Sequence, residues 1–152
     1  MRPAVGNDFI ISMKINTEEG EGGITENGVI TASKLAEKAG LDLIQLSGTK
    51  WFNERSKTPF YYEMGKKLAD ILNIPVIVTG AARDLDNLNE ILNNSNIKYF
   101  GLARPLICEP DLITRLKNGS TKKAKCVSCN TCLKNFSTGV ACILNKKKKL
   151  LL

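Results

Sequence analysis

The 152-residue sequence contains no histidine. This excludes a catalytic triad built on histidine within the chain, and it excludes histidine as a metal ligand. Long apolar stretches are also missing: the three leucines at 150–152 are far too few to cross a bilayer. The apolar segment 9–13 is too short for the core of a signal peptide and is interrupted by Lys14. We therefore predict a cytoplasmic protein that has no contact with membranes.

Aromatic residues are scarce, at 6% of the chain, although the formal net charge is +7. Much of the positive excess lies in the last third, at Lys117, Lys122, Lys123, Lys125, Lys134 and residues 146–149. No aromatic side chains alternate with these lysines, as a stacking surface for single-stranded nucleic acid would require. A terminal lysine run of this kind is typical of a solvated tail. We therefore do not expect nucleic acid as a partner.

Hydrophobic residues make up 43% of the chain and charged residues 24%, which are the proportions of a globular protein with a real core. Four short apolar runs recur, at residues 9–15, 41–46, 74–78 and 97–102. Their spacing of about thirty residues suits right-handed βαβ units. The order predicts an α/β protein with four parallel strands, near-continuously apolar and buried on both faces by crossover helices.

The segments between these runs carry apolar residues at helical spacing. The first apolar stripe includes Val29 and Leu35 and is expected to end at Gly40, and the third is expected to begin at Asp84. A fourth helix is expected after Pro110, with Leu112, Ile113 and Leu116 turned inward and Gly119 at its end. Four such βα units are half of a (β/α)8 barrel, and a small open flavodoxin-like sheet fits the length equally well.

Two strand ends are especially informative, at residues 76–83 and 99–105. Each is an apolar run that ends in small residues, with an arginine close behind and a helix to follow. Small residues at the end of a buried strand let backbone N–H groups approach an anion closely, and the next helix adds its positive N-terminal end. Two such units in succession predict a phosphate cradle, as barrels form it after their last two strands.

Segments at residues 12–16, 21–25, 75–80 and 101–112 resemble the NADH:flavin oxidoreductase family, also called the old yellow enzyme family. The last segment is the most specific, because strand, small residue, arginine and a Pro-Asp-Leu helix start occur in register. The resemblance runs from Val5 to about Asn145 and corresponds to strands five to eight of that family's FMN-binding TIM barrel. It implies FMN as cofactor, and a complete enzyme that passes hydride from NAD(P)H through FMN to an electron-poor acceptor such as an activated C=C bond.

The resemblance assigns Lys14, at the end of the first strand, to the pyrimidine edge of the flavin. A fixed cation there stabilises the negative charge that develops when the flavin is reduced. The alternative is a partly buried lysine that reaches out of the barrel mouth into water.

Four residues are assigned to the FMN phosphate: Gly80, Ala81, Ala103 and Arg104. The family usually has glycine at the positions of Ala81 and Ala103, and alanine resists a positive φ. Arg104 is expected to add a charged, bidentate contact to the phosphate. Its alternative is a salt bridge with Glu109 or Asp111.

The sequence has five cysteines, of which four lie within seventeen residues and Cys108 stands apart. The four are Cys126, Cys129, Cys132 and Cys142. Four thiols so close together suit an iron–sulfur or zinc site. Larger relatives, such as dienoyl-CoA reductases and trimethylamine dehydrogenase, carry a [4Fe-4S] cluster in a similar segment with slightly longer spacings. The alternative is a structural cysteine cluster that holds no metal.

Residues 47–49 are expected to end the second strand. They lead into a loop that contains the aromatic residues Trp51, Phe52, Phe60 and Tyr61. In a barrel this loop would cover the cofactor or substrate, and plain packing of the aromatics against a helix is as reasonable. The family's substrate-anchoring His/Asn or His/His pair and its proton-donating tyrosine come from earlier strands. We therefore assign no catalytic residue in this chain.

Residues 1–119 are predicted to form the half-barrel with the phosphate-binding turns, and residues 120–152 a basic linker, a cysteine-rich segment and a lysine-rich tail. We predict the FMN-binding portion of an NAD(P)H-dependent flavin oxidoreductase. Its open sheet edges call for an N-terminal half-barrel or a second copy of the chain as partner. The alternatives are a non-catalytic phosphate-binding or scaffold half-barrel and a four-cysteine metal module.

Overall fold

The computed structural model describes residues 2–17, 23–48, 59–134 and 139–146. Its strands are β1 (Ser12–Asn16), β2 (Leu43–Ser47), β3 (Val76–Thr79) and β4 (Tyr99–Gly101). Its helices are α1 (Arg2–Val5), α2 (Glu26–Lys38), α3 (Tyr62–Ile71), α4 (Leu85–Asn93), α5 (Arg104–Cys108), α6 (Leu112–Lys117), the 3₁₀ helix η2 (Thr131–Leu133) and α7 (Ile143–Lys146). None of the helices in these ranges is long and apolar enough to span a bilayer.

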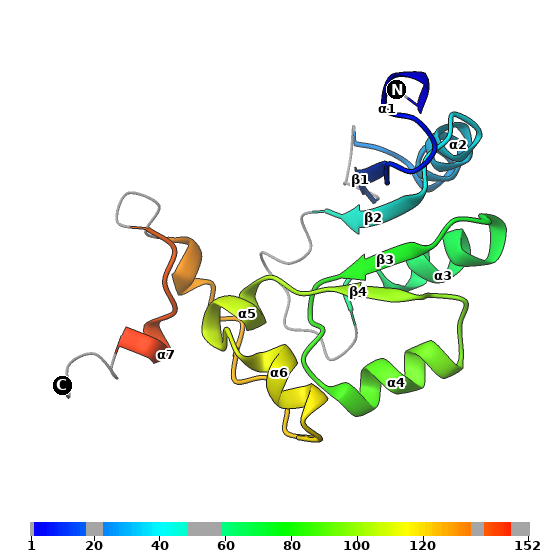
Figure 1. The fold of residues 1–152 in the computed structure, drawn as a ribbon. Coiled ribbons are helices and arrows are strands. Elements are labelled where there is room, and N and C mark those ends of the chain that lie inside the picture. Colours follow the sequence, from blue (N-terminus) through cyan, green and yellow to red (C-terminus); the bar gives the residue numbers. More distant parts are fainter. Residues whose placement is uncertain (1, 18–22, 49–58, 135–138, 147–152) are drawn as a thin grey trace.

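The four strands form one parallel sheet in the order β1-β2-β3-β4. Each strand therefore lies beside its neighbour in sequence, and helices α2, α3 and α4 make the crossovers (Figure 1). This confirms the predicted alternation of strands and helices in an α/β fold. The arrows of β2 and β3 in Figure 1 point toward the side where α5 and α7 lie, and β1 and β4 run parallel to them. The carboxyl ends of the strands and the C-terminal third of the chain thus share one side of the molecule.

The hydrophobic core fills the layer between the sheet and its helices. Its completely buried members include Val29 of α2, Leu68 of α3, and the strand residues Ile44, Leu46, Val76 and Val78. Helix α3 packs very closely on β3, because a Cβ on Gly65 would lie 2.4 Å from Cγ2 of Val78. The sheet and the helices are therefore fixed to each other by interdigitated side chains rather than by the backbone alone.

The opposite face of the sheet differs from the prediction that helices bury both faces. Burial alternates along β2, where Ile44 and Leu46 are buried while Gln45 and Ser47 are only half-buried. Along β1 the side chains of Ser12, Lys14 and Asn16 are exposed. Because neighbouring side chains of a strand point to opposite faces, this alternation gives a sheet covered on one side and open on the other among the described residues. In a closed barrel the open face would be the lumen.

Helix boundaries follow the sequence signals in part. The Oγ1 of Thr25 accepts a hydrogen bond of 3.1 Å from the backbone N–H of Gly28 and so caps α2. Leu35, placed on the inner stripe by its spacing, is 63% exposed, and Ile113 is exposed as well. Both expectations were wrong because neighbouring positions, Ser33 and Leu112, take the buried place instead. Helix α5 was not predicted as a separate element.

The chain after α6 folds back along the turn that follows β3. The backbone N–H of Ala124 donates to the carbonyl of Arg83 at 2.8 Å, and Lys123 Nζ lies 2.6 Å from Asp84 Oδ2. The buried carboxylate of Glu109 accepts from Arg115 Nε at 2.7 Å and lies 3.4 Å from Lys125 Nζ. These contacts hold the start of the cysteine-rich segment against the carboxyl edge of the sheet.

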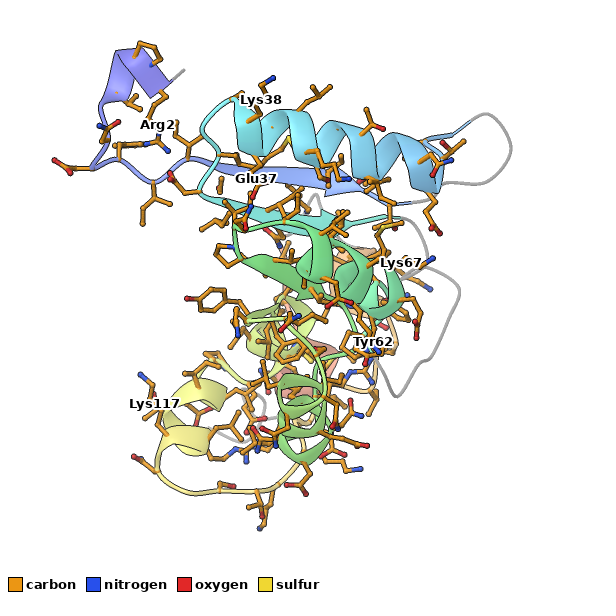
Figure 2. All side chains as sticks on the ribbon, turned by 90° about the vertical axis from the view of Figure 1, so that its right-hand side faces the viewer. Arg2, Glu37, Lys38, Tyr62, Lys67 and Lys117 are labelled. Atoms are coloured by element: carbon orange, nitrogen blue, oxygen red, sulfur yellow. The ribbon has the colours of Figure 1, made fainter. Side chains whose placement is uncertain are left out.

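At the amino edge of the sheet, Arg2 ties α1 to two separate turns. Its guanidinium donates to the carbonyls of Gly40 and Phe9, at 2.7 and 2.6 Å, and to the carboxylate of Asp42. Figure 2 shows this side chain reaching from α1 toward the start of β1. The contact fixes the first strand in register at the end remote from the site described below.

Candidate functional site

A cavity of about 450 Å³ opens at the carboxyl ends of the strands. Its walls come from all four strands, from the turns after β3 and β4, and from the cysteine-rich segment, which contributes Ser128 and Leu133. The cavity brings together the five residues that the sequence assigned to a cofactor: Lys14, Gly80, Ala81, Ala103 and Arg104. They meet because the carboxyl ends of parallel strands share one edge of a sheet, although residues 14 and 104 are far apart in sequence.

The turn after β3 has two consecutive residues in the left-handed region, Gly80 with φ +85° and Ala81 with φ +51°. Successive backbone N–H groups in a turn can face one concave surface, which is how proteins build anion-binding nests. For Ala81 the conformation costs about 1–2 kcal/mol relative to glycine. A Cβ on Gly80 would lie 2.4 Å from Cδ2 of Phe60, so glycine is required there for space as well as for φ.

The turn after β4 is built differently. Gly101 packs against Thr79, whose Cγ2 would lie 2.5 Å from a Cβ at this position. Ala103 stands before the first residue of α5 with φ −122° and does not need a positive φ. An alanine is therefore tolerated at 103 without the strain that Ala81 bears. Arg104 follows directly as the first residue of α5.

Two guanidinium groups line the cavity, Arg83 from the first turn and Arg104 from the second. Arg83 donates to the hydroxyl of Ser128, and Arg104 donates to the side-chain oxygen of Asn130. Burial lowers the pKa of Arg83; a nearby Cys126 opposes this and the charge of Arg104 adds to it. Two cations that line one cavity, beside a turn whose backbone amides can act as donors, form an environment suited to a dianion.

The alternative for Arg104 was a salt bridge with Glu109 or Asp111, and the carboxylate of Glu109 has other partners. Glu109 is 2% exposed and is bound by Arg115 and Lys125 instead, which lowers its pKa to about 2, chiefly through the Arg115 hydrogen bond. The sequence reasoning left Arg83 out of the candidate site. A signal was present, because each arginine stands three residues after a glycine at a strand end: Gly80 directly follows β3, and Gly101 is the last residue of β4.

Lys14 lies on the open face of β1, opposite Gln45 of β2 in the strand register, and both line the cavity. Its side chain is exposed. Gln45 was not singled out from the sequence, where a glutamine within an apolar run carries no specific signal. The expectation that Lys14 ends the first strand was wrong, because β1 continues to Asn16. Lys14 and Gln45 are the central residues of β1 and β2, and they give the cavity one cation and one amide two residues before the strands end.

Trp51 and Phe52, which the sequence analysis placed over the site, lie outside the described residues. Phe60 and Tyr61 are described, with ring centroids 6.3 Å apart in an edge-to-face arrangement. Tyr61 is buried and lines the cavity, whereas Phe60 packs against Gly80. Phe60 thus supports the turn after β3, whereas Tyr61 packs against Gly48, directly after β2.

A second cavity, of only about 10 Å³, adjoins the first and is lined by all five cysteines. Cys108 and Cys132 are buried, whereas Cys129 is exposed. Burial raises the pKa of the Cys108 thiol to about 12, and its hydrogen bond to Cys142 contributes. Among the described residues, no group of three or more His, Cys, Asp or Glu side chains is arranged to hold a metal ion. The residues as placed do not fit a metal, and the four-cysteine metal site stays a prediction from the sequence.

Searched against protein-family models, the chain matches none. It is 27% identical over 139 residues to an NADH oxidase of Thermoanaerobacter brockii, covering 86% of this chain and 21% of that protein. A bilirubin reductase of Mediterraneibacter gnavus is 24% identical over 141 residues, covering 83% of this chain and 22% of the relative. An NADH-dependent flavin oxidoreductase of Neonectria sp., iliE, is 24% identical over 129 residues. This match covers 72% of this chain and 17% of the relative.

Among solved structures, a 2-naphthoyl-CoA reductase in complex with 2-naphthoyl-CoA superimposes with a TM-score of 0.76. The sequence identity is 18%, and the match covers 95% of this chain and 24% of that one. The chain is a homologue of the NADH:flavin oxidoreductases. The resemblance to the old yellow enzyme family, first seen in the strand-end segments, is thereby confirmed.

The chain spans about a fifth of the length of the curated relatives it matches. Its parallel sheet with alternating helices is TIM-barrel-like, as the similarity to the reductase structure shows. The relation to flavin-dependent oxidoreductases rests on sequence and on fold together. That the strands are the fifth to eighth of a barrel, and that residues 1–119 and 120–152 are separate units, remain predictions.

Proposed function

We propose that this chain is the FMN-binding portion of an NAD(P)H-dependent flavin oxidoreductase and corresponds to the C-terminal half of its barrel. The observation that carries the proposal is the cavity at the strand ends, which all five sequence-assigned residues line. Its volume of about 450 Å³ lies within the roughly 300–1,000 Å³ of cofactor-sized sites.

The phosphate end of the site is the pair of turns after β3 and β4. The backbone amides around Gly80 and Ala81 supply donors, and Arg83 and Arg104 supply two positive charges. Ser128 and Asn130 accept hydrogen bonds from these arginines and so fix the direction of each guanidinium. A phosphate monoester is the group that this donor set fits, because it takes several N–H donors and two cations at once.

The ring end of the site is the open face of β1 and β2. Lys14 stands there as an exposed cation beside Gln45. When bound, FMN supplies hydride transfer between NAD(P)H and an electron-poor acceptor. Lys14 would hold positive charge at the pyrimidine edge, where it favours the reduced state.

The described sheet leaves one edge of β1 and one edge of β4 without a strand partner. Unpaired edges and an open polar face are completed in a barrel by further strands. We therefore propose that turnover needs an N-terminal half-barrel or a second copy of this chain. Such a partner would also provide the acid that protonates the acceptor.

The proposal is tested by titrating the purified chain with FMN and following the quenching of flavin fluorescence. Arg104→Ala should weaken binding by about 10–150-fold, since a hydrogen bond to a charged group contributes about 1.5–3 kcal/mol. Arg104→Lys should recover only part of the loss, because lysine keeps the charge but not the planar fork. Lys117→Ala is the matched control: Lys117 is exposed on α6 and does not line the cavity (Figure 2).

Equal affinities for the native chain and Arg104→Ala would contradict the assignment of the phosphate end. If the native chain takes up no FMN at all, the phosphate-binding or scaffold half-barrel without a flavin becomes the better description.

A further inference from the structure

The cysteine-rich segment contacts the candidate site through two residues, Ser128 and Asn130. Ser128 is 7% exposed and lines the large cavity, and Asn130 is half-buried directly before η2. The hydroxyl of Ser128 accepts a hydrogen bond from Arg83, and the side-chain oxygen of Asn130 accepts one from Arg104. One short stretch of chain therefore contacts both guanidinium groups of the proposed phosphate site.

These two residues share an uncommon backbone conformation. Ser128 has φ +55° and Asn130 has φ +59°, both in the left-handed region. Asparagine enters this region more readily than most residues, whereas serine is strained there. A folded chain retains such a conformation where its surroundings impose it, often beside a ligand site. Both residues of this kind in the segment are the ones that contact an arginine of the cavity.

The partners of the cavity arginines differ in charge from those of two arginines elsewhere in the chain. Arg2 and Arg115 are each held by a carboxylate. Arg83 and Arg104 instead donate to a hydroxyl oxygen and to an amide oxygen, which are neutral. A carboxylate orients a guanidinium but also cancels its charge. A neutral oxygen orients the guanidinium without cancelling the charge that attracts a further anion.

We propose that Ser128 and Asn130 are positioning residues that make the site specific for a phosphorylated flavin over an unphosphorylated one. The inference rests on the proposed function and adds that the cysteine-rich segment takes part in selecting the ligand. The two neutral oxygens hold Arg83 and Arg104 at the cavity wall without competing with the phosphate for their charge. A negative charge in place of either oxygen would pair with the arginine and repel the phosphate.

The test replaces Asn130 with aspartate in the full chain and measures flavin affinity by fluorescence quenching. Aspartate has nearly the same size, keeps an acceptor oxygen and also tolerates the left-handed conformation. Asn130→Asp should lower the affinity for FMN by about 10–150-fold, which corresponds to the loss of one hydrogen bond to a charged group. The affinity for riboflavin, which has no phosphate, should stay the same. A merely structural role of Asn130 would change both affinities together or neither.

A second variant removes the other oxygen without adding charge. Ser128→Gly loses the hydroxyl, and glycine adopts φ +55° without strain, so the variant should fold. We expect its affinity for FMN to fall about 10-fold and its affinity for riboflavin to stay the same. Asn118→Asp is the matched control for the added charge, because Asn118 is exposed at the end of α6 and does not line the cavity. The control should change neither affinity.

The outcomes separate this inference from the proposed function. If the native chain prefers FMN and both variants keep that preference in full, the role of Ser128 and Asn130 is refuted while the phosphate-binding turns stand. If the native chain binds FMN and riboflavin equally, or binds neither, the phosphate end of the site is refuted, and the selection by this segment with it.

Discussion

Replacing Gly80 with alanine probes the first phosphate turn at its most crowded point. Gly80 has φ +85°, and a Cβ there would lie 2.4, 3.2 and 3.3 Å from three ring atoms of Phe60. The variant therefore meets two penalties, one from the left-handed backbone and one from the collision with the ring. The chain offers a control that separates them. Gly119 has φ +86°, and a Cβ at that position would meet nothing within 4 Å.

The backbone penalty is the same at both positions. A left-handed alanine costs about 1–2 kcal/mol, and the stiffer unfolded chain returns about 0.4–1 kcal/mol. Gly119→Ala should thus lower the free energy of unfolding by about 1 kcal/mol. Gly80→Ala carries in addition the cost of overpacking, about 1–3 kcal/mol. We expect the two variants to differ by about 2 kcal/mol, which is the steric contribution of Phe60 alone.

The difference is measured by urea unfolding, followed by circular dichroism. With a slope of about 2 kcal/mol per molar urea, Gly80→Ala should have its midpoint about 1 M below that of Gly119→Ala. The Gly80→Ala variant should also bind FMN more weakly, because either the phenyl ring of Phe60 or the turn itself must move. Equal midpoints for the two variants would refute the close contact between Phe60 and the turn, and with it the described shape of the cradle.

Two further predictions concern stability and pH. The Glu109 carboxyl has its pKa lowered to about 2, mainly by Arg115, so it contributes stability that is complete above its ordinary pKa of 4.5 and is lost as the pH falls through 2. Glu109→Gln should lower the free energy of unfolding at pH 7 by about 2 kcal/mol, allowing for solvent screening. It should also make that free energy depend less steeply on pH between pH 5 and 2. A pH dependence as steep as that of the native chain would contradict this. Thr25→Ala should cost about 1 kcal/mol in thermal unfolding through the lost cap on α2, whereas Thr25→Ser should be nearly neutral.

The order of strands and helices was predictable because apolar runs and helical stripes alternate with a nearly constant period. The gathering of Lys14, Gly80 and Arg104 at one cavity followed from the same order, since parallel strands all end at one edge. The family resemblance suggested which anion, the phosphate of FMN, the site would take. Local signals and one topological rule were therefore sufficient for most of the candidate site.

The rest depended on tertiary contacts that no local pattern reports. The partners of the two arginines, Ser128 and Asn130, come from a segment whose path is set by Glu109 and its two cations. The left-handed φ of Ala81 opposes the intrinsic preference of alanine and is imposed by the turn between β3 and α4. The partners of the arginines and the conformation of Ala81 therefore depend on which of several competing contacts is stronger in the folded chain.

We propose that the turns after β3 and β4 bind a phosphate. This proposal is tested most directly by comparing the affinity of the native chain for FMN with its affinity for riboflavin, which has the same ring system and no phosphate. If the amides around Ala81 and the guanidinium groups of Arg83 and Arg104 hold the phosphate, FMN should bind at least about 100-fold more tightly, and the difference should shrink in Arg104→Ala. Equal affinity for FMN and riboflavin would show that these turns do not bind the phosphate.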